Sequence, residues 1–374
     1  MSTNDTHIHG QKKRVIIAGG GTGGHIFPAI AIANALKQLD AGMDILFVGA
    51  KGKMEMEKIP QAGYEIKGLD IAGFNRSALW KNAGLPFKLI KSYFQVRKIF
   101  RDFPPDAVVG VGGYSTYPVL RLAQSRNIPS FIHESNSFAG KANTMLGKKA
   151  TRIFVATGGM EKFFPPEKIV ISGNPVRKSI VEATVSRAEA LSFFGLDPSR
   201  TTILAVGGSL GARSINAAIA SHIDAFAAAN LQLIWQTGKT TAAEYIAKGK
   251  GHANIWVNDF ITDMEKAYAA ADIVVSRAGA MAVAEVCVVA KPAVFVPFPL
   301  AAEDHQTANA MSLVNKQAAL IVKDSDAKNS LVKTVIALAA DKAAQTQLHE
   351  KIKPLGIRNA DTLVAEEILK TVHG

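Results

Sequence analysis

Residues 18–25 have types and spacing that suit the binding of a phosphorylated ligand. Three glycines, at 19–21, lead into Thr22, Gly23, Gly24 and His25. Glycine lets the backbone turn sharply and come close to a ligand, and the free N–H groups at the start of a helix favour negative charge. His25 stands at the same place, and imidazole titrates near neutral pH, so it can move a proton. The segment predicts an anion-binding loop with a candidate proton acceptor.

A dinucleotide site is the first alternative for this loop. Its glycines fit the pattern G-x-G-x-x-G, but that pattern also needs an acid about 20 residues further on, at the end of the second strand. Here the second predicted strand runs into Gly49, Ala50 and Lys51, with no carboxylate for an adenosine ribose. This weighs against a nicotinamide cofactor. A tight strand–helix turn without a ligand remains the other interpretation.

A second set of candidate residues lies in the second half of the chain. Residues 207–212 form a glycine loop after a predicted strand, and the backbone N–H groups and Ser209 hydroxyl there can bind a diphosphate. Glu285 falls in the early turns of a predicted helix, where a carboxylate can accept two hydrogen bonds from a ribose diol. Gln306 can both donate to and accept from sugar hydroxyls. The alternatives are a packing turn for the loop and an exposed helix acid for Glu285.

Metal ions and cofactors are not expected. The D-x-D segment 324–326 is a pattern that some sugar transferases use to hold a divalent ion, but it lies in a late polar loop and is interpreted as solvent-exposed. Cys287 is the single cysteine, which excludes a disulfide framework and argues against a cysteine zinc site.

The elements that position these residues alternate between strands and helices. This alternation predicts an α/β fold with parallel sheets covered by helices on both faces, and with ligands at the carboxyl ends of the strands. The loops that follow three first-half strands would bring His25, Tyr114, Glu134 and Asn136 around one crevice. The predicted strands are 14–18, 44–49, 107–111, 129–133, 152–156, 168–172, 201–206, 231–235, 254–257, 272–276, 292–296 and 318–322.

The turn residues Gly173-Asn174-Pro175 interrupt this alternation, and a fresh strand and glycine loop follow. We therefore predict two domains, residues 1–173 and 174–353. Helices are expected at about 329–349 and 359–372. The Pro-Leu-Gly segment 354–356 can direct the last segment, 354–374, back to the first domain.

The formal net charge of +12 suggests an anionic partner. No nucleic-acid motif is present, so a phosphorylated ligand or an acidic membrane surface is expected instead. Residues 85–101 predict an amphipathic helix that is either core-facing with a basic, solvated back or in contact with anionic lipid headgroups. Trp80, just upstream, favours lipid contact. One face would carry Leu89, Tyr93, Val96 and Phe100, and the other Lys88, Lys91, Gln95 and Lys98.

Seven segments in order resemble the MurG family, the bacterial transferases that move N-acetylglucosamine (GlcNAc) from UDP-GlcNAc to lipid I, a lipid-linked muramyl-pentapeptide. The resemblance implies a GT-B fold, with two Rossmann-like domains facing across a cleft, the donor on the second and the lipid acceptor on the first. It implies inverting transfer to the muramyl 4-hydroxyl, giving lipid II for peptidoglycan, at the cytoplasmic face of the bacterial inner membrane. The segments are 20–29, 112–114, 133–134, 173–177, 207–209, 277–280 and 304–306.

The resemblance also implies roles for individual residues. His25 is the expected base, and Glu134 is the second candidate, as base or as the group that orients His25. The Ile261 backbone would hold uracil and Glu285 the ribose. Leu210 and Ser135 stand where the family usually has Gln, which could change donor or acceptor contacts. The donor contacts carried over are Thr22, Gly23, Gly24, Asn136, Arg177, Ser209, Ile261, Ala280, Met281, Ala282, Val283, Ala284, Glu285 and Gln306.

Other functions stay open at this point. A related GT-B enzyme could act on another acceptor, such as a diacylglycerol, or be a sugar-nucleotide epimerase. A nicotinamide oxidoreductase and a non-catalytic sugar-nucleotide binder are further alternatives.

Overall fold

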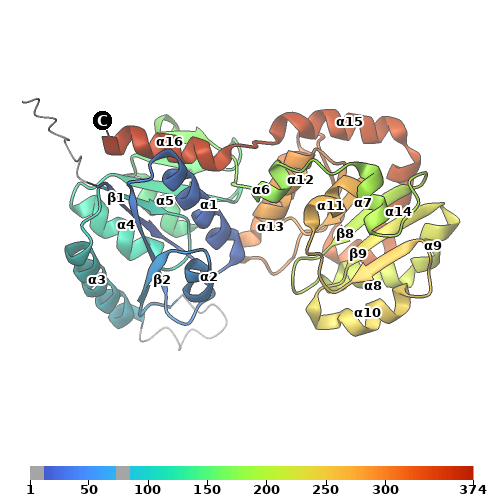
Figure 1. Ribbon diagram of the computed structural model, residues 1–374, viewed down its shortest axis with the longest axis horizontal. Coiled ribbons are helices and arrows are strands. Elements are labelled where there is room, and N and C mark those ends of the chain that lie inside the picture. The colour runs from blue at the N-terminus through green and yellow to red at the C-terminus, as the bar shows by residue number, and fades with distance from the viewer. Residues whose placement is uncertain (1–11, 73–84, 374) are drawn as a thin grey trace, which may run out of the picture.

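Two parallel β-sheets, each covered by helices on both faces, make up the two halves of the computed structural model, which describes residues 12–72 and 85–373 (Figure 1). The first sheet has the strand order β3-β2-β1-β4-β5-β6-β7, and the second has the order β10-β9-β8-β11-β12-β13. All neighbouring strands pair in parallel. The expected α/β architecture is confirmed. Trp80 lies outside the described residues.

The first half contains seven strands and five helices among the described residues. They are β1 (Arg14–Ala18), α1 (Gly23–Leu39), β2 (Asp44–Ala50), α2 (Glu55–Gln61), β3 (Glu65–Leu69), α3 (Leu85–Asp102), β4 (Ala107–Gly110), α4 (Thr116–Ser125), β5 (Ser130–Glu134), α5 (Lys141–Gly147), β6 (Arg152–Val155) and β7 (Ile169–Ile171).

The second half follows the connecting segment after β7. Its elements, and the final helix, are α6 (Lys178–Val181), α7 (Arg187–Phe193), β8 (Thr201–Val206), α8 (Arg213–Ser221), α9 (Ile223–Ala228), β9 (Leu231–Gln236), α10 (Ala242–Gly249), β10 (Ile255–Asn258), α11 (Met264–Ala270), β11 (Ile273–Ser276), α12 (Ala280–Val289), β12 (Ala293–Phe295), α13 (His305–Val314), β13 (Leu320–Ile321), α14 (Ala327–Ala340), α15 (Lys342–Ile352) and α16 (Ala360–His373).

The twelve strands expected from the sequence all occur, and their ends lie within two residues of the expected ones. The sequence analysis missed β3, an edge strand whose Glu65 and Lys67 face solvent. The single helix expected at 329–349 is wrong, because the chain breaks at Asp341. The backbone of Asp341 is extended there, and its carboxylate accepts a hydrogen bond from the Ala344 N–H at 2.9 Å, which caps α15.

The strand order reverses direction between β1 and β4 in the first half, and between β8 and β11 in the second. Loops that follow strands on either side of such a point diverge and leave a ligand crevice. In the first half these loops touch, since the Gly20 N–H donates to the Gly112 carbonyl at 3.1 Å. Gly113 has a φ of +93°, and a Cβ there would lie 2.5 Å from the Gly20 carbonyl oxygen, so the contact requires glycine.

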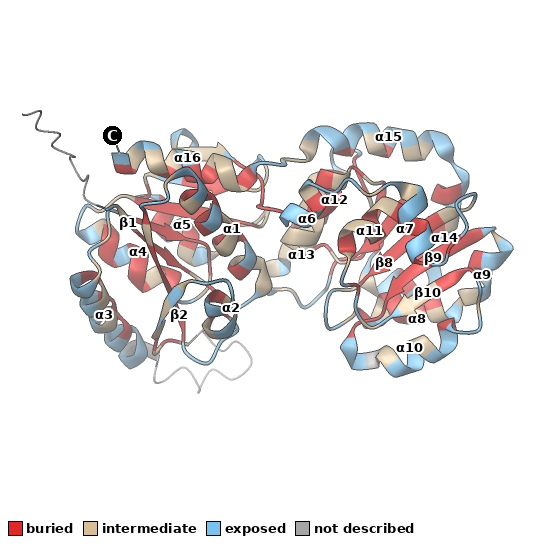
Figure 2. Ribbon diagram, viewed as in Figure 1, coloured by how far each residue is buried: buried red, intermediate tan, exposed pale blue. Residues whose placement is uncertain are grey.

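The final helix, α16, returns to the first half and lies against α1 (Figure 1). Val364, Ala365 and Ile368 of α16 are buried in the same apolar cluster as Ile26 and Ile32 of α1. The strands form the buried centre of both halves, whereas the outer face of α3 is exposed (Figure 2). Among the described residues, no helix combines the length and apolar character needed to cross a membrane.

Candidate active site

His25 lies in the first turn of α1, half-buried, with one ring nitrogen held by the glycine loop. Its Nδ1 is 3.0 Å from the Gly20 carbonyl oxygen. A carbonyl can only accept, so Nδ1 carries the hydrogen, and in the neutral ring Nε2 then keeps a lone pair. A Cβ on Gly112 would lie 2.8 Å from Nε2, so the second glycine loop leaves room for this ring. The geometry presents Nε2 as a proton acceptor at the switch point of the first sheet.

The residues before His25 form the start of the same helix. Thr22 is the N-cap residue, with an extended backbone, and its hydroxyl lies 3.5 Å from His25 Nδ1. Gly23 and Gly24 are the first two residues of α1. The N–H groups of a helix's first residues lack intrahelical partners, so this end can accept an anion.

The sequence analysis missed a buried carboxylate beneath the loop, that of Glu55 at the start of α2. Its Oε2 accepts from the Gly21 N–H at 2.8 Å, and its Oε1 accepts from the Ala50 N–H at 3.0 Å. Glu55 is 1% exposed. Nothing in the local sequence separates Glu55 from the exposed Glu57, so only the fold identifies it.

Glu134, at the end of β5, is occupied by its own loop. Oε1 accepts from the Asn136 backbone N–H at 3.2 Å and from the Asn136 side chain at 3.4 Å, and Oε2 accepts from Gly140 N–H at 3.2 Å and Asn143 at 2.9 Å. The side chain is buried. A carboxylate whose oxygens bind four donors is suited to fixing a loop, rather than to taking a substrate proton or orienting His25.

Ser135 connects this loop to α1. Pro28 lacks an N–H, so it leaves the Gly24 carbonyl without its usual helical donor. The Ser135 hydroxyl lies 3.4 Å from that oxygen and donates to it. Ser135 thus joins the loop after β5 to the anion-binding end of α1.

Polar side chains join the two halves near the predicted donor site. Asn309 of α13 donates to the Asn136 side chain at 3.2 Å and accepts from the Ser137 N–H at 2.8 Å. Asn174 donates to the Ser135 carbonyl at 2.9 Å and lies 3.4 Å from the Ala280 carbonyl. Asn136 therefore does lie at the junction, although the sequence analysis did not find Asn309, its partner.

Glu285, which is buried, contacts two other side chains. Arg177, in the segment between the halves, contacts Glu285 Oε1 at 3.0 Å, and the Tyr268 hydroxyl donates to Oε2 at 3.0 Å. Burial, followed by the neighbouring Glu285 charge, raises the pKa of Tyr268 well above its usual value, so the hydroxyl stays protonated and donates. Arg177 and Glu285, two predicted donor contacts, are in direct contact with each other.

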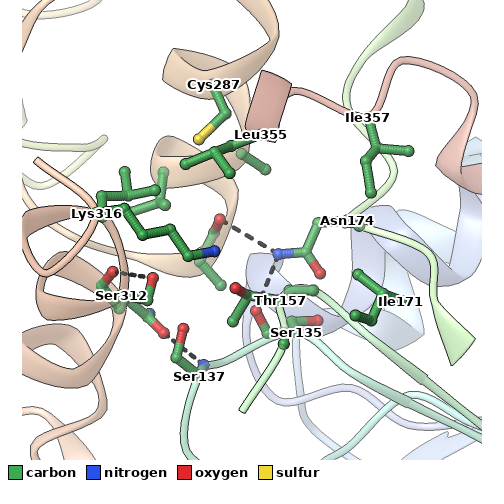
Figure 3. A pocket seen from close by; sticks show the side chains of 18 of the residues that line it. Ser135, Ser137, Thr157, Ile171, Asn174, Cys287, Ser312, Lys316, Leu355 and Ile357 are labelled. Atoms are coloured by element: carbon green, nitrogen blue, oxygen red, sulfur yellow. Dashed lines mark hydrogen bonds between the residues drawn. The ribbon is translucent and has the colours of Figure 1, made fainter. Parts of the chain in front are cut away.

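The predicted segment 280–285 divides between two faces of α12. Helical spacing places Ala280, Val283 and Ala284 on one face and Glu285 on the opposite one. The first face lines a cavity of about 240 Å³ between the halves, shown with its side chains in Figure 3. Residues of the loops that follow β5 and β6, of β7, of α13 and of the segment before α16 complete its walls. Met281 and Ala282 lie beside Glu285, away from this cavity.

The loops of the second sheet hold Ser209 and Ile261. Ser209 is exposed in the loop after β8, and its carbonyl accepts from the Lys239 N–H at 3.2 Å. Leu210 beside it is 72% exposed. Ile261 is buried, and its N–H donates to the Gln236 side chain at 3.0 Å. A uracil could donate a hydrogen bond to the Ile261 carbonyl directly. To accept one from the Ile261 N–H, it would have to displace the Gln236 side chain, a partner that the sequence did not predict.

Gln306 follows a turn of unusual conformation. Glu303 and Asp304 have φ values of +55° and +52°, a region that non-glycine residues rarely adopt and that is found at binding sites. Gln306 is the second residue of α13, and its Oε1 accepts from the Phe298 N–H at 3.0 Å. That bond uses only the oxygen, and the amide NH₂ group is the part suited to a sugar hydroxyl.

The interpretation of segment 324–326 as wholly solvent-exposed is wrong for Asp324. Its Oδ1 lies 2.5 Å from Arg277 Nη1 and 2.5 Å from the Ser214 hydroxyl. Arg277 follows β11 and contacts the short turn that precedes α14, a contact that only the fold determines. Within the described part of the chain, no cluster of three or more His, Cys, Asp or Glu side chains could hold a metal ion.

Two Rossmann-like halves, each with a glycine loop at its switch point, define the class of GT-B glycosyltransferases. Residues 15–155 match the glycosyltransferase family 28 N-terminal domain, and residues 202–364 match its C-terminal domain. The chain is 49% identical over 365 residues to a UDP-N-acetylglucosamine–N-acetylmuramyl-(pentapeptide) pyrophosphoryl-undecaprenol N-acetylglucosamine transferase of Parabacteroides distasonis, covering 97% of this chain and 99% of that one. The present chain therefore belongs to the family of MurG transferases.

Other comparisons agree with this assignment. A Bacteroides fragilis protein of the same name is 47% identical, with 98% of each chain covered. The crystal structure of Acinetobacter baumannii MurG matches with a TM-score of 0.79 and 31% identity, covering 96% of this chain and 99% of that one. A UDP-N-acetylglucosamine 2-epimerase matches with a TM-score of 0.63 over 96% of this chain and 95% of its own, but at 14% identity it shares the fold alone.

Proposed function

We propose that this protein transfers N-acetylglucosamine from UDP-GlcNAc to the muramyl 4-hydroxyl of lipid I, with inversion, giving lipid II for peptidoglycan synthesis. The observation that carries the proposal is near-full-length identity of 47–49% to transferases named for this reaction. The transfer needs a proton acceptor and groups that bind the donor. His25 Nε2 in the first half can accept the proton, and Arg177 and Glu285 in the second half can bind the donor.

His25 is the proposed base. Inversion requires the acceptor hydroxyl to lose its proton as it attacks the sugar carbon from the face opposite the departing diphosphate. Nε2 is available for this because Nδ1 donates to Gly20. A positioned general base contributes about 10²- to 10⁴-fold to the rate of such a step. The four hydrogen bonds that Glu134 accepts make it the organiser of the 134–143 loop in this proposal, rather than the base.

The second half would hold the donor. The developing charge on the departing UDP would be stabilised by the glycine-loop N–H groups near Ser209 and by Arg177, without a metal ion. Arg177 now pairs with Glu285, so donor binding would have the guanidinium shared between carboxylate and diphosphate while Glu285 accepts from the ribose. Thr22, Gly23 and Gly24 would face the donor from the first half, and Asn136 and Gln306 would contact its sugar.

The partner surface is proposed to be the anionic cytoplasmic face of the inner membrane, bound peripherally by α3. Val96 and Phe100 of α3 face the core as expected, but Leu89 is 39% exposed. Phe87, Ile90 and Phe94 are exposed to 77%, 57% and 62%. Basic side chains at Arg97, Lys98 and Arg101 flank them. Exposed apolar groups beside cations suit an anionic lipid surface.

The decisive experiment measures GlcNAc transfer from UDP-GlcNAc to a lipid I analogue by the wild type and by His25→Ala. We expect kcat to fall at least about 100-fold in the variant, since the base is lost, while the KM for UDP-GlcNAc changes little. UDP release should require the acceptor analogue. Near-normal kcat in His25→Ala would move the base elsewhere, and equal UDP release without acceptor would contradict the transfer itself.

A further inference from the structure

We propose that Glu55 is a positioning residue for the transfer reaction, acting on His25 through the peptide unit between Gly20 and Gly21. The inference rests on the proposed role of His25 as the base. The proposal gives a function to Glu55, a buried carboxylate beneath the first glycine loop. Glu55 is not among the residues expected to contact the donor or the acceptor.

The first observation is the environment of the carboxylate. Both oxygens accept backbone hydrogen bonds, from Gly21 and from Ala50, at 2.8 and 3.0 Å. A Cβ on Gly20 would lie 2.2 Å from the Glu55 carboxyl carbon, and a Cβ on Gly49 would lie 2.5 Å from its Cγ. One glycine of the first loop and one of β2 therefore make the space that the side chain occupies. A buried carboxylate is costly unless donors satisfy it, so its place is specified by these contacts.

The second observation is the geometry of one peptide unit. The Gly21 N–H that Glu55 binds and the Gly20 carbonyl that binds His25 Nδ1 belong to the same planar amide. In a trans peptide these two groups point in opposite directions. The Glu55 carboxylate therefore binds the N–H of this amide, and the His25 Nδ1–H binds its carbonyl. The amide thus links the carboxylate to the imidazole through two hydrogen bonds.

The consequence concerns which nitrogen of His25 carries the hydrogen. With the amide fixed, the carbonyl faces Nδ1, and the tautomer that leaves Nε2 free is favoured. Hydrogen bonds in a chain polarise one another, so the carboxylate also strengthens the acceptor that the imidazole meets. When Nε2 takes the acceptor's proton, the resulting imidazolium is stabilised through this chain. A carboxylate plays the same part by direct contact in hydrolase triads.

The test variant is Glu55→Gln, which keeps the shape but places an amide NH₂ against one backbone N–H. We expect kcat for transfer to the lipid I analogue to fall about 10- to 100-fold, with a much smaller change in the KM for UDP-GlcNAc, because most of the proposed donor contacts lie on the other half. Glu55→Asp, which keeps the charge, should retain more activity than Glu55→Gln. Glu57→Gln is the matched control, because Glu57 lies on the same helix, is exposed and should leave kcat unchanged.

Two further measurements separate positioning from mere support of the loop. In ¹⁵N-labelled protein, the His25 signal, identified by its loss in His25→Ala, should show the Nδ1–H tautomer in the wild type and a mixture in Glu55→Gln. In the His25→Ala background, Glu55→Gln should have no further effect on kcat. An unchanged tautomer in Glu55→Gln, or equal losses in both backgrounds, would overturn the proposal for Glu55. Near-normal kcat in His25→Ala would instead overturn the role of His25, so the two failures are distinguishable.

Discussion

Two histidines of the first half lie in contrasting environments. His25 is half-buried at the loop edge, and its Nδ1 contacts Gly20. His133 lies in β5 and is fully buried, with Nε2 3.4 Å from the Gly173 carbonyl and Nδ1 3.4 Å from the Ser135 hydroxyl. Burial lowers the pKa of His133 to about 4, and the neighbouring His25 adds to this effect. Only His25 is placed to exchange a proton with a ligand.

The depressed pKa of His133 predicts a loss of stability at acid pH. The unfolded chain takes up a proton near pH 6.5, whereas the folded protein resists it until about pH 4. The contribution is therefore complete above pH 6.5 and is lost as pH falls towards 4, with a total of about 3 kcal/mol. Urea unfolding of the wild type and of His133→Gln, at pH 7 and pH 4.5, measures it. Equal pH dependence in both proteins would contradict the prediction.

At the scale of elements, helix starts and strand ends carry the candidate site. The start of α1 supplies the anion-binding N–H groups, and Pro28 frees the Gly24 carbonyl for Ser135 of the β5 loop. Helix α12 brings Glu285 to Tyr268 and Arg177 on one face and lines the cavity of Figure 3 with the other. Helix α12 thus contacts its own half with one face and the space between the two halves with the other.

The exposed face of α3 gives a prediction about lipid binding. Replacing Phe87 and Phe94 with Ser should reduce binding to vesicles that contain acidic lipids by about tenfold or more, because two apolar side chains no longer enter the lipid surface. Flotation measures the bound fraction. Phe193→Ser, an exposed aromatic of the second half, is the control. Undiminished flotation of the double variant would place the lipid surface elsewhere.

The charged side chains of α3 are tested separately. Lys91 is a poor choice, since it pairs with Asp70 at 2.9 Å. Arg97 and Lys98 are exposed, and their change to Gln should weaken binding to acidic vesicles more than to neutral ones, by about 1 kcal/mol for each charge. The difference should shrink as salt is added.

At the scale of the molecule, the chain passes between the halves twice. It leaves the first half after β7 and returns through the segment that leads into α16, which completes the core around α1 (Figure 1). Asn174 and Asn309 are the buried polar links between the halves. The last helix therefore stabilises the half that carries His25. The boundary at residues 173/174 stays a prediction.

Truncation of one side chain on α16 tests this coupling. Ile368 is fully buried against α1, and Ile368→Ala should destabilise the first half by about 2–5 kcal/mol through the lost apolar contacts and the cavity left behind. Thermal unfolding measures the effect, and Glu366→Ala on the exposed face of the same helix is the control. An equal melting temperature in the two variants would show that α16 adds little to this core.

The alternation of strands and helices, apart from β3, and the glycine loops after β1, β4 and β8 could be predicted from the sequence. Apolar runs, turn residues and helix signals are local patterns, so they can be recognised in the sequence. Strands that alternate with helices form a parallel sheet, in which the loops that follow the strands lie at one edge. The candidate residues His25 and Ser209 could be proposed for the same reason, since His25 lies in the first turn of α1 and Ser209 lies in the loop after β8.

Only the tertiary structure decided what the individual polar groups do. Glu55 and Glu57 look alike in the sequence, yet one lies beneath the loop and the other faces water. The partners of Glu134, of the Ile261 N–H and of Asp324 were equally hidden. The physical reason is that a carboxylate or amide takes its role from the donors and acceptors within about 3 Å of it. Distant segments of the chain supply many of these groups, and they meet only when the chain has folded.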